Sequence, residues 1–371
     1  MTATGSVAGF APVRVGSVRG AVPSVPPAAG IEGRVRLRYP NRLNAMALDP
    51  SKVLPGAGSY PAGELVFVTD LFTSVEVQGT ASGDGVEITA DSARPVLGRH
   101  AALLMRQVLG LTGGMRITIR SHPLPPHVGL GSSSAVLSAV AAAINELCGR
   151  PLDHRTLMRL LVDNHGEEID GNDDEIMPVQ CIGGSAAAGL VPGAIQVVSG
   201  NAVALLAAPA PAGHTIVLAV PPDLRSWDAS ESLRAEAENF DGFLETGRRY
   251  APQIAYRLLH ECWPDLVTGT PRTLGQLVFD YRFEMGSIRN CAFSHPRLLE
   301  YAEQVRQLFE SGQAAVLSLS SVGPLFFALT EQPDVVAAGF EAAGLTTFRA
   351  MPWDQGYLID ECTVKRHARD G

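Results

Sequence analysis

The sequence has 371 residues, of which 46% are hydrophobic and 18% are charged. This length allows two ordinary domains with buried cores, and the composition excludes general disorder. A formal net charge of −9 disfavours nucleic acid as the main partner, because duplex binding needs clustered Lys and Arg. Five scattered cysteines form no CxxC pair and no zinc spacing, which indicates reduced thiols in a cytoplasmic protein.

The first half of the chain is expected to form one domain behind a leader. Residues 1–30 are rich in Gly, Ala, Pro and Val and lack a continuous apolar region, so we expect a flexible leader rather than a signal peptide. An N-terminal phosphate-binding domain is expected over residues 31–206. Alternating apolar residues predict its first strands at 35–39, 65–68, 73–77, 86–89 and 115–120, and helical spacing predicts a helix at 100–109.

A glycine–serine loop follows the last of these strands. Gly129 and Gly131 precede three serines, Ser132 to Ser134, and an Ala-rich run at helical spacing begins there. Glycine lets the backbone approach a ligand closely, and a helix N-terminus offers N–H groups and a positive dipole end to phosphate. The other interpretation is an ordinary serine-capped buried helix. The order strand, glycine turn, helix favours a site for phosphate or pyrophosphate. The Ala-rich run itself is too short to cross a membrane.

The most acidic stretch of the chain is residues 167–175, after a helix predicted at 153–164. Its candidates for a metal site or for proton transfer are four carboxylates: Asp170, Asp173, Asp174 and Glu175. The alternative is a solvated acidic loop, because runs of like charge usually face water.

The second half begins after an uncharged, proline-rich linker at residues 207–213, and a C-terminal domain is expected over residues 214–371. Strands are predicted at 215–220, 315–319, 326–329, 346–349 and 356–359, and helices at 230–246, 251–261, 274–288, 296–312 and 334–343. Residues 320–324 (SSVGP) form a second small-residue turn between two strands.

Three separated segments resemble the galactokinase/homoserine kinase/mevalonate kinase/phosphomevalonate kinase (GHMP) superfamily. They are residues 36–44 (RLRYPNRLN), 126–134 (PHVGLGSSS) and 319–329 (LSSVGPLFFAL), in the order of the family's motifs. The resemblance implies an α+β fold of two domains. The N-terminal domain would contain a left-handed β-α-β unit, the C-terminal domain would be ferredoxin-like, and the active site would lie between them.

Two of these segments are most similar to the β-ribofuranosylaminobenzene 5′-phosphate synthase branch of the superfamily. They are residues 127–132 (HVGLGS) and residues 320–324. Residues 40–44 are similar as well, with Asn44 where the branch usually has histidine. This resemblance implies a C-glycoside synthase that uses phosphoribosyl pyrophosphate. Such an enzyme joins C1 of the ribose to an aromatic or heteroaromatic carboxylic acid and releases pyrophosphate and CO2.

One segment departs from that branch. The synthases carry a Gly-Thr-Ser-Gly-Ile-Gly run where this chain has residues 170–175 (DGNDDE). The segment is closer to a homoserine kinase motif, with Asp174 near the kinase aspartate, although the match needs a one-residue insertion. An ATP-dependent kinase that phosphorylates a hydroxyl group is therefore the alternative, and a non-catalytic binding protein is a third possibility.

The resemblance implies roles for particular residues. Those expected to bind phosphate or pyrophosphate are His127, Gly129, Gly131, Ser132, Ser133, Ser134, Arg42, Ser320, Ser321 and Gly323. Mg²⁺ would be held by Asp170, Asp174 and Ser133, and Asp173, Asp174 and Glu175 are the candidates for catalysis. The expected partners are small-molecule substrates, with no nucleic acid or membrane, and the protein could form a homodimer.

Several of these assignments have a structural alternative. His127 could equally cap the loop, and Arg42 could form a surface salt bridge. Ser320 and Ser321 could serve only to let strands approach. His122 is interpreted as structural. Candidates for binding an acidic aromatic ring in the second domain are Arg282, Arg289 and His295.

Overall fold

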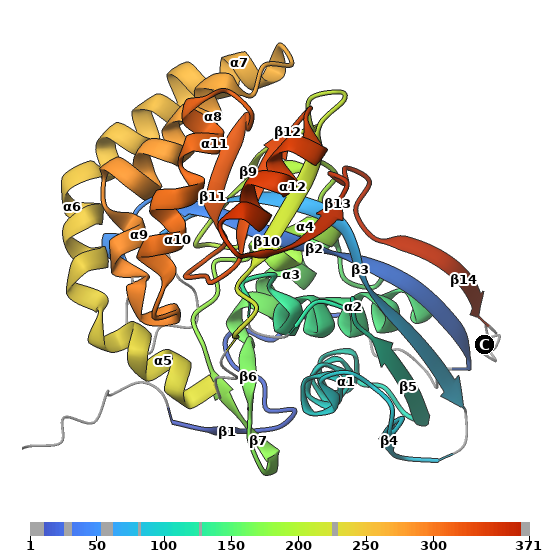
Figure 1. Cartoon of the computed structure of the whole chain (residues 1–371). Coiled ribbons are helices and arrows are strands. Elements are labelled where there is room, and N and C mark those ends of the chain that lie inside the picture. Colours follow the sequence, from blue (N-terminus) through green and yellow to red (C-terminus); the bar gives the residue numbers. More distant parts are fainter. Residues whose placement is uncertain are drawn as a thin grey trace, which may run out of the picture.

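The chain folds into two β-sheets that are covered by helices, as a computed structural model shows (Figure 1). The structure describes residues 11–25, 32–52, 62–80, 83–125, 128–224 and 229–364. The mixed α+β class expected from the sequence is confirmed. No helix in these ranges is long and apolar enough to cross a membrane.

The first sheet has seven strands and is built on two long ones, β2 (Gly33–Ala47) and β3 (Glu64–Thr80), which pair along their length. The far half of β3 pairs with β5 (Gly114–Arg120) and its near half with β8 (Ile195–Ser199). β4 (Val86–Ile88) extends the sheet beyond β5, and β9 (Val203–Ala208) extends it beyond β8. Each strand predicted in this domain lies within one of these elements or overlaps it.

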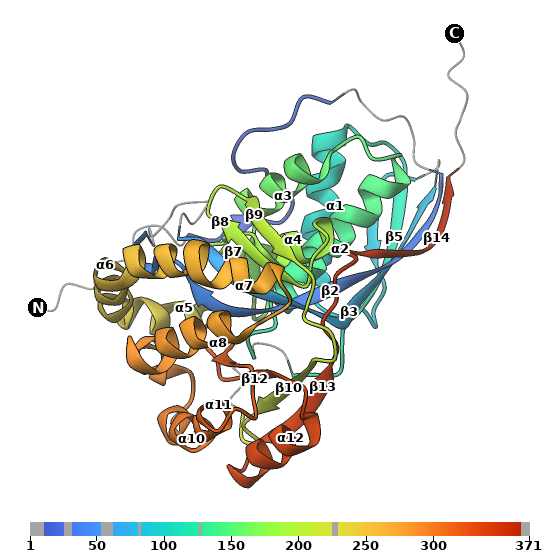
Figure 2. The same cartoon turned by 90° about the horizontal axis from the view of Figure 1, so that it is seen from above.

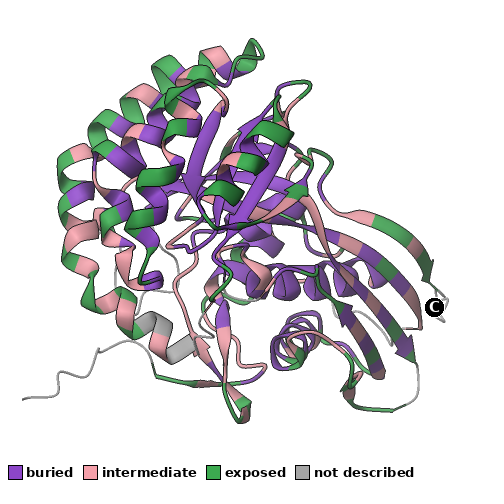
Figure 3. Ribbon diagram, in the orientation of Figure 1, coloured by how far each residue is buried: buried purple, intermediate pink, exposed green. Residues whose placement is uncertain are grey.

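Four helices cover one face of this sheet: α1 (Pro95–Leu109), α2 (Ser132–Leu147), α3 (His154–Asp163) and α4 (Gly184–Leu190). α2 is buried along almost its whole length (Figure 3). A helix that is apolar on all sides must be surrounded by protein, which explains the Ala-rich run after the serines. Its first turn therefore has a fixed position against the sheet.

The acidic stretch forms a β-hairpin instead of a loop. β6 (Gly166–Ile169) and β7 (Asn172–Pro178) are its strands, and β1 (Val13–Arg14) adds a third strand at the edge of β7. Residues 13 and 14 belong to the leader that we expected to be flexible. This part of the leader is instead packed against the N-terminal domain.

The second sheet has the antiparallel order β11-β12-β10-β13. Its strands are β10 (Thr215–Val220), β11 (Val316–Leu319), β12 (Phe326–Thr330) and β13 (Thr346–Ala350). With helices between β10 and β11 and between β12 and β13, this order is that of a ferredoxin-like domain.

Helices fill the long connection between β10 and β11 and lie to the left of the second sheet in Figure 1. They are α5 (Ala229–Glu238), α6 (Phe240–Arg257), α7 (Trp263–Val267), α8 (Arg272–Phe279), α9 (Ser287–Asn290), α10 (Leu298–Val305) and α11 (Gln307–Glu310), with π-helical turns at η2 (Leu258–Cys262) and η3 (Asp280–Glu284). Short 3-10 turns lie at η1 (Pro50–Lys52) and η4 (Ala292–Ser294), and α12 (Pro333–Ala342) packs on β10.

The last strand, β14 (Leu358–Val364), returns to the first sheet and pairs with β2 (Figure 2). The range 214–371, expected as the C-terminal domain, contains this strand, but the strand makes its hydrogen bonds to the N-terminal sheet. Local periodicity indicates a strand here, but only the pairing decides to which sheet it belongs.

A β-bulge in β2 joins the two sheets. The register with β3 shifts next to Ala45, which has no β3 partner. Its carbonyl accepts hydrogen bonds instead from Nε of the buried Arg282 and from Ser318 Oγ, each at 2.9 Å. Arg282 Nη2 also donates to the carbonyl of Leu319 at 2.7 Å. Arg282 thus connects η3 and β11 to β2, and these bonds occupy the guanidinium that we considered for substrate binding.

Apolar side chains also pack between the two sheets. Phe67 of β3 and Phe327 of β12 are both buried, with ring centroids 5.5 Å apart. Leu43 of β2 and Leu218 of β10 belong to the same apolar cluster. The orientation of the two domains is therefore fixed by a common core and by the Arg282 bonds.

Gly189 offers a test of how tightly α4 packs on the first sheet. A Cβ at this position would collide with the ring of Tyr39, which is fully buried and whose hydroxyl donates to Ala186 O at 2.5 Å. We expect Gly189→Ala to lower the free energy of unfolding by about 1–3 kcal/mol through overpacking. Urea denaturation followed by circular dichroism measures the change. The control is Gly85→Ala, since no atom lies within 4 Å of its Cβ position. Equal midpoints for the two variants would contradict this packing.

Candidate functional site

The three segments that resemble family motifs meet at the start of α2. Ser320 Oγ donates to the carbonyl of Gly129 at 2.7 Å and accepts from the backbone N–H of Asn44 at 3.0 Å. The N–H of Ser321 donates to Asn44 O at 2.9 Å. The middle of β2, the glycine loop and the turn after β11 are therefore one hydrogen-bonded unit. Ser320 thus connects the two domains by hydrogen bonds.

Two glycines in the loop are required by close contacts. Gly129 has φ +103°, and a Cβ there would lie 2.5 Å from Ser320 O. Gly131 has φ +66°, and a Cβ there would collide with Ser185 Oγ and lie 3.2 Å from Arg42 Cζ. Both positions combine a left-handed backbone with a neighbour that leaves no room for a side chain.

The first turn of α2 has the electrostatic character of an anion site. Its N-cap, Gly131, has no side chain to cap the helix, so the first N–H groups depend on another acceptor. Arg42 lies beside it and donates from Nη1 to Gly129 O at 3.2 Å, while its Nε is buried without a hydrogen-bond partner. Among the described residues no carboxylate lies within ion-pair distance of Arg42. The guanidinium charge is therefore available to an anion.

A serine–carboxylate pair lies on the same turn. Ser133 Oγ donates to Glu167 Oε2 at 2.6 Å, and Glu167 extends from β6. Burial raises the pKa of Glu167, although Arg94 and the bond from Ser133 act in the opposite direction. A hydroxyl and a partly buried carboxylate beside an anion site are suitable ligands for a divalent cation that phosphate oxygens also coordinate. Glu167 was not among our site candidates, although it lies inside the acidic stretch.

Ser132 is oriented by a histidine. His122 Nδ1 accepts from the backbone N–H of Leu124 at 3.2 Å, so Nε2 carries the proton and donates to Ser132 Oγ at 3.1 Å. Burial lowers the pKa of His122, which keeps the ring neutral. The bond from His122 leaves the Ser132 hydroxyl free to donate to a ligand.

A buried carboxylate, Glu64, connects α4 to β2 next to the site. Glu64 on β3 accepts from the N–H of Gly184 at 2.6 Å and from the side-chain amide of Asn44. A Cβ at Gly184 would lie 2.5 Å from Glu64 Oε1, which explains the glycine. The adjacent Ser185 is buried, and its Oγ, next to Gly131, has no hydrogen-bond partner. Sequence reasoning missed Glu64, because a single acidic residue at the start of a strand carries no motif.

The hairpin separates most of the predicted carboxylates from the serines. Met177 is the β7 residue paired with Glu167, and Asp174 lies three positions further, about 10 Å along the strand. Asp174 is exposed and faces Arg99 at 3.8 Å. Asp170 lies in the turn of the hairpin. The predicted grouping of Ser133, Asp170 and Asp174 is not formed in this structure.

The other two acidic candidates also lie on the outer part of the hairpin. Asp173 is exposed, and Glu175 accepts from the side-chain amide of Asn172 at 3.0 Å. No group of three His, Cys, Asp or Glu side chains in the described part of the chain converges as a metal site. These observations favour the solvated alternative for the carboxylates at 170, 173, 174 and 175.

The remaining candidates are placed as follows. His127 lies outside the described residues. Gly323 has φ +96°, and a Cβ there would lie 3.0 Å from Ser294 Oγ, so the turn after β11 is closely packed. Arg289 is exposed, and His295 is buried and lies 3.3 Å from a carboxylate oxygen of Asp223. The structure does not bring Arg289 or His295 into contact with the glycine loop.

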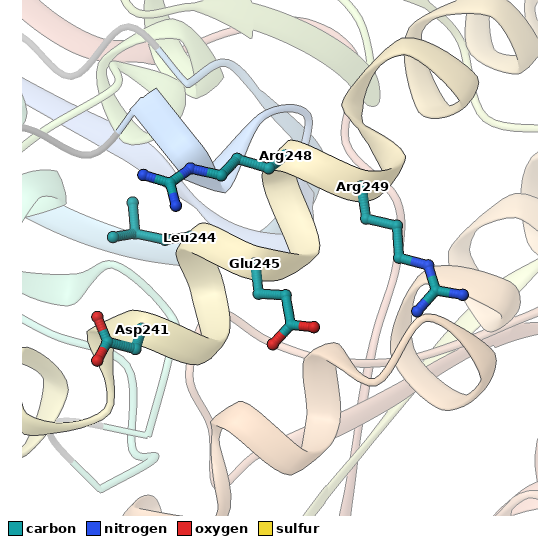
Figure 4. Close-up of a pocket in the computed structure, with 5 residues that line it drawn as sticks. All are labelled: Asp241, Leu244, Glu245, Arg248 and Arg249. Carbon is teal, nitrogen blue, oxygen red and sulfur yellow. The ribbon is translucent and has the colours of Figure 1, made fainter.

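An open hollow of about 510 Å³ lies on the surface of α6 and is a different kind of feature (Figure 4). Its lining comes from this one helix: Asp241, Leu244, Glu245, Arg248 and Arg249. Acidic and basic side chains at helical spacing are typical of a solvated helix face. We therefore place the candidate site at the start of α2.

Part of the chain is similar to a known protein family. Residues 96–179 match the family model of the GHMP kinases N terminal domain, a span that includes the glycine loop, α2 and the hairpin. No curated protein sequence matches the chain. This segment is therefore similar to the GHMP kinases N-terminal domain, in agreement with the superfamily expected from the three motifs.

Solved structures share the fold across both domains. Homoserine kinase from Cytophaga hutchinsonii is 17% identical with a TM-score of 0.55, covering 88% of this chain and 97% of that one. Mevalonate diphosphate decarboxylase from Staphylococcus aureus is 13% identical with a TM-score of 0.61, covering 89% and 98%. A complex of MDDEF with MVAPP, AMPPCP and magnesium is 17% identical with a TM-score of 0.57, covering 89% and 99%. At identities this low, the similarity shows a shared fold and nothing more.

Gly131 tests the anion site. Gly131→Ala would force a Cβ toward Ser185 and Arg42, so we expect the affinity for Mg²⁺–pyrophosphate to fall by about tenfold or more. Isothermal titration calorimetry measures this affinity. Gly149→Ala is the matched control, because Gly149 also has a left-handed φ of +79° but no atom within 4 Å of its Cβ position. The site is misplaced if both variants bind equally well.

The raised pKa of Glu167 predicts a pH-dependent stability. In the metal-free protein, a folded-state pKa above the ordinary carboxyl pKa means that the folded state holds the proton more tightly than the unfolded state. The free energy of unfolding should therefore fall as pH rises from the ordinary pKa through the folded-state pKa. Glu167→Gln keeps an acceptor for Ser133 and removes the charge, so it should stabilise the protein at pH 8. It should have little effect at pH 4, where the carboxyl is largely protonated. Urea denaturation with a chelator present checks this, with the exposed Glu87→Gln as control. A lower midpoint at pH 8 would refute the expected sign.

Proposed function

We propose that this chain is an enzyme that transfers the ribose 5-phosphate of phosphoribosyl pyrophosphate to an aromatic or heteroaromatic carboxylic acid. The products are a C-glycoside, pyrophosphate and CO2. The observation that carries the proposal is the Ser133–Glu167 pair beside the unpaired Arg42 at the start of α2. These groups are suited to a diphosphate with a bound cation.

The diphosphate would accept hydrogen bonds from the first N–H groups of α2 and from Ser132. Arg42 would face its negative charge, which grows as the C1–O bond of the sugar breaks. Donors fixed by the fold stabilise this charge without rearrangement. The hydrogen bond from Ser320 Oγ occupies the carbonyl of Gly129, so the N–H groups at the start of α2 would be the groups that face the phosphate.

Ser133 and Glu167 would hold Mg²⁺ together with diphosphate oxygens, in place of the grouping expected from the sequence. Their 2.6 Å contact and the partial burial of the carboxylate fit this role. When bound, Mg²⁺ neutralises part of the charge on the leaving group.

The proposed reaction needs no base at the acceptor. The C1–O bond of the ribose breaks with both electrons leaving on pyrophosphate, and the ring carbon that bears the carboxylate forms the new bond to C1. Loss of CO2 from that carbon then returns its bonding electrons to the ring. Among the described residues, the ionisable side chains hydrogen-bonded to the loop are Arg42, His122 and Glu167. None of them is free as a base while it binds the cation or orients the loop.

Residues 320–324 favour the synthase branch over the kinases. This SSVGP turn is similar to that of the synthases, and Ser320 lies directly on the glycine loop. The second half of the site is thus formed by the motif that separates this branch from the kinases. The acceptor acid would be bound between the domains.

A second candidate is ATP-dependent phosphorylation of a hydroxyl group on a small molecule. The similarity in fold to homoserine kinase and to MDDEF, which was solved with AMPPCP and magnesium, favours it. The loop would then hold nucleotide phosphates, with Ser133 and Glu167 at the cation. Asp174, the sequence candidate for orienting the hydroxyl, lies further away than Glu167.

The two candidates differ in the co-substrate. With Mg²⁺ present, phosphoribosyl pyrophosphate should raise the melting temperature, and a panel of aromatic carboxylic acids should then give pyrophosphate and CO2 in equal amounts. Thermal shift and coupled pyrophosphate and CO2 assays measure both. Stabilisation by ATP alone would replace the synthase with the kinase. No response to either ligand would favour a non-catalytic binding protein.

Variants identify the carboxylate that matters. Ser133→Ala and Glu167→Gln should lose the Mg²⁺-dependent shift and about 100-fold in turnover. Asp174→Asn should retain both, because its side chain is exposed on the outer part of the hairpin. The exposed Ser311→Ala is a matched serine control. A large loss in Asp174→Asn with a normal Glu167→Gln would restore the assignment made from the sequence.

A further inference from the structure

We propose that residues 13–19, here called the strap, set the position of Glu167, and that Arg19 is a positioning residue for this carboxylate. The inference rests on the proposed role of Glu167 at the cation. It assigns a function to a segment that precedes the first sheet and lies outside the span of the matching family model.

The strap is bound to the outer edge of the hairpin (Figure 1). Val13 and Arg14 pair with β7 opposite Ile176 and Glu175. The N–H of Val15 donates to the carbonyl of Asp174 at 2.9 Å. Without these bonds β7 would be an unpaired edge, and a two-stranded hairpin has little stability of its own.

The strap then crosses α1. The N–H of Gly16 donates to Nδ1 of the fully buried His100 at 2.9 Å. Nε2 of this ring lies 3.0 Å from the carbonyl of Asn164 and carries the proton, because Nδ1 is an acceptor. A Cβ on Gly16 would lie 2.6 Å from Leu103 Cβ, so the strap lies directly against the helix. The strap is thus connected to the residue that ends α3.

Arg19 makes the last contact before the hairpin. Its N–H donates to Asn164 Oδ1 at 2.5 Å, and Asn164 Nδ2 donates back to Arg19 O at 3.1 Å. The guanidinium donates from Nη2 to His165 O at 2.5 Å. Asn164 is almost fully buried and also donates to Leu160 O at 2.8 Å. These bonds fix the backbone at residues 164 and 165.

Glu167 follows two residues after His165, and the next residue, Glu168, is also held in place by hydrogen bonds. Glu168 Oε1 accepts from the N–H groups of Val96 and Leu97, at the start of α1. The backbone is therefore held by hydrogen bonds on both sides of Glu167, at residues 164–165 and at Glu168, and Glu167 accepts from Ser133. A free strap would release the N-terminal one of these points. Because a carboxylate must be placed to within a fraction of an ångström to share a cation with a phosphate, the strap bears on cation affinity.

The test uses Arg19→Ala in the full chain. Backbone amides of β6 should exchange with deuterium about tenfold faster than in the wild type. Affinity for Mn²⁺ in the presence of inorganic pyrophosphate, measured by electron paramagnetic resonance, should fall about fivefold or more. Arg14→Ala is the matched control, since this arginine is on the strap with its side chain exposed. Arg19→Lys retains a cation that can reach His165 O and should recover part of the affinity.

The outcomes separate the two proposals. Unchanged exchange and unchanged Mn²⁺ affinity in Arg19→Ala would overturn the role of Arg19 as a positioning residue, because this variant lacks the guanidinium bond to His165 O. The same loss in Arg14→Ala would also overturn it, because the effect would then not depend on the Arg19 contacts. A wild-type protein that binds no Mn²⁺–pyrophosphate would overturn the proposed function instead. If Arg19→Ala does not fold, Arg19→Lys carries the test, with slower exchange and higher affinity in the wild type as the supporting result.

Discussion

The hydrogen bonds of Ser320 to Gly129 and Asn44 are the constraint on which the site depends. They connect a turn of the second domain to the glycine loop and to the middle of β2, which come from three distant parts of the chain. The bulge at Ala45 and the buried Arg282 strengthen the same junction. These bonds hold the carbonyl of Gly129 against the turn after β11.

Arg42 and Glu167, two charged side chains beside the loop, form no ion pair with each other. Arg42 has no carboxylate partner among the described residues and keeps a buried donor unpaired, and burial disfavours the charge on Glu167. Both features oppose folding, since polar and charged groups are normally paired when buried. An anion with a bound cation would satisfy both. Buried or partly buried groups of this kind cluster at functional sites, where they stabilise charge that develops during reaction.

The fold and the site answer different questions. Homoserine kinase and mevalonate diphosphate decarboxylase share the architecture at low identity, and one fold supports several chemistries. The proposed reaction rests on the donors at the start of α2 and on the turn at residues 320–324. The proposed role of the strap adds a level of control, because the position of Glu167 would then depend on contacts made by residues far from it in the sequence.

The sequence by itself determined the elements and the loop. Alternation identified strands such as the one at 115–120, and helical spacing identified α2. Three ordered motifs indicated the superfamily and predicted a phosphate site at the glycine loop. These are local signals, carried by side chains within a few residues of each other. Only the tertiary structure decided that β14 joins the first sheet and that Glu167, not Asp170 or Asp174, reaches Ser133. In a hairpin the register and the turn decide which side chain faces a neighbour, and nine residues with six carboxylates offer several solutions that differ only in packing against the strap, α1 and α2.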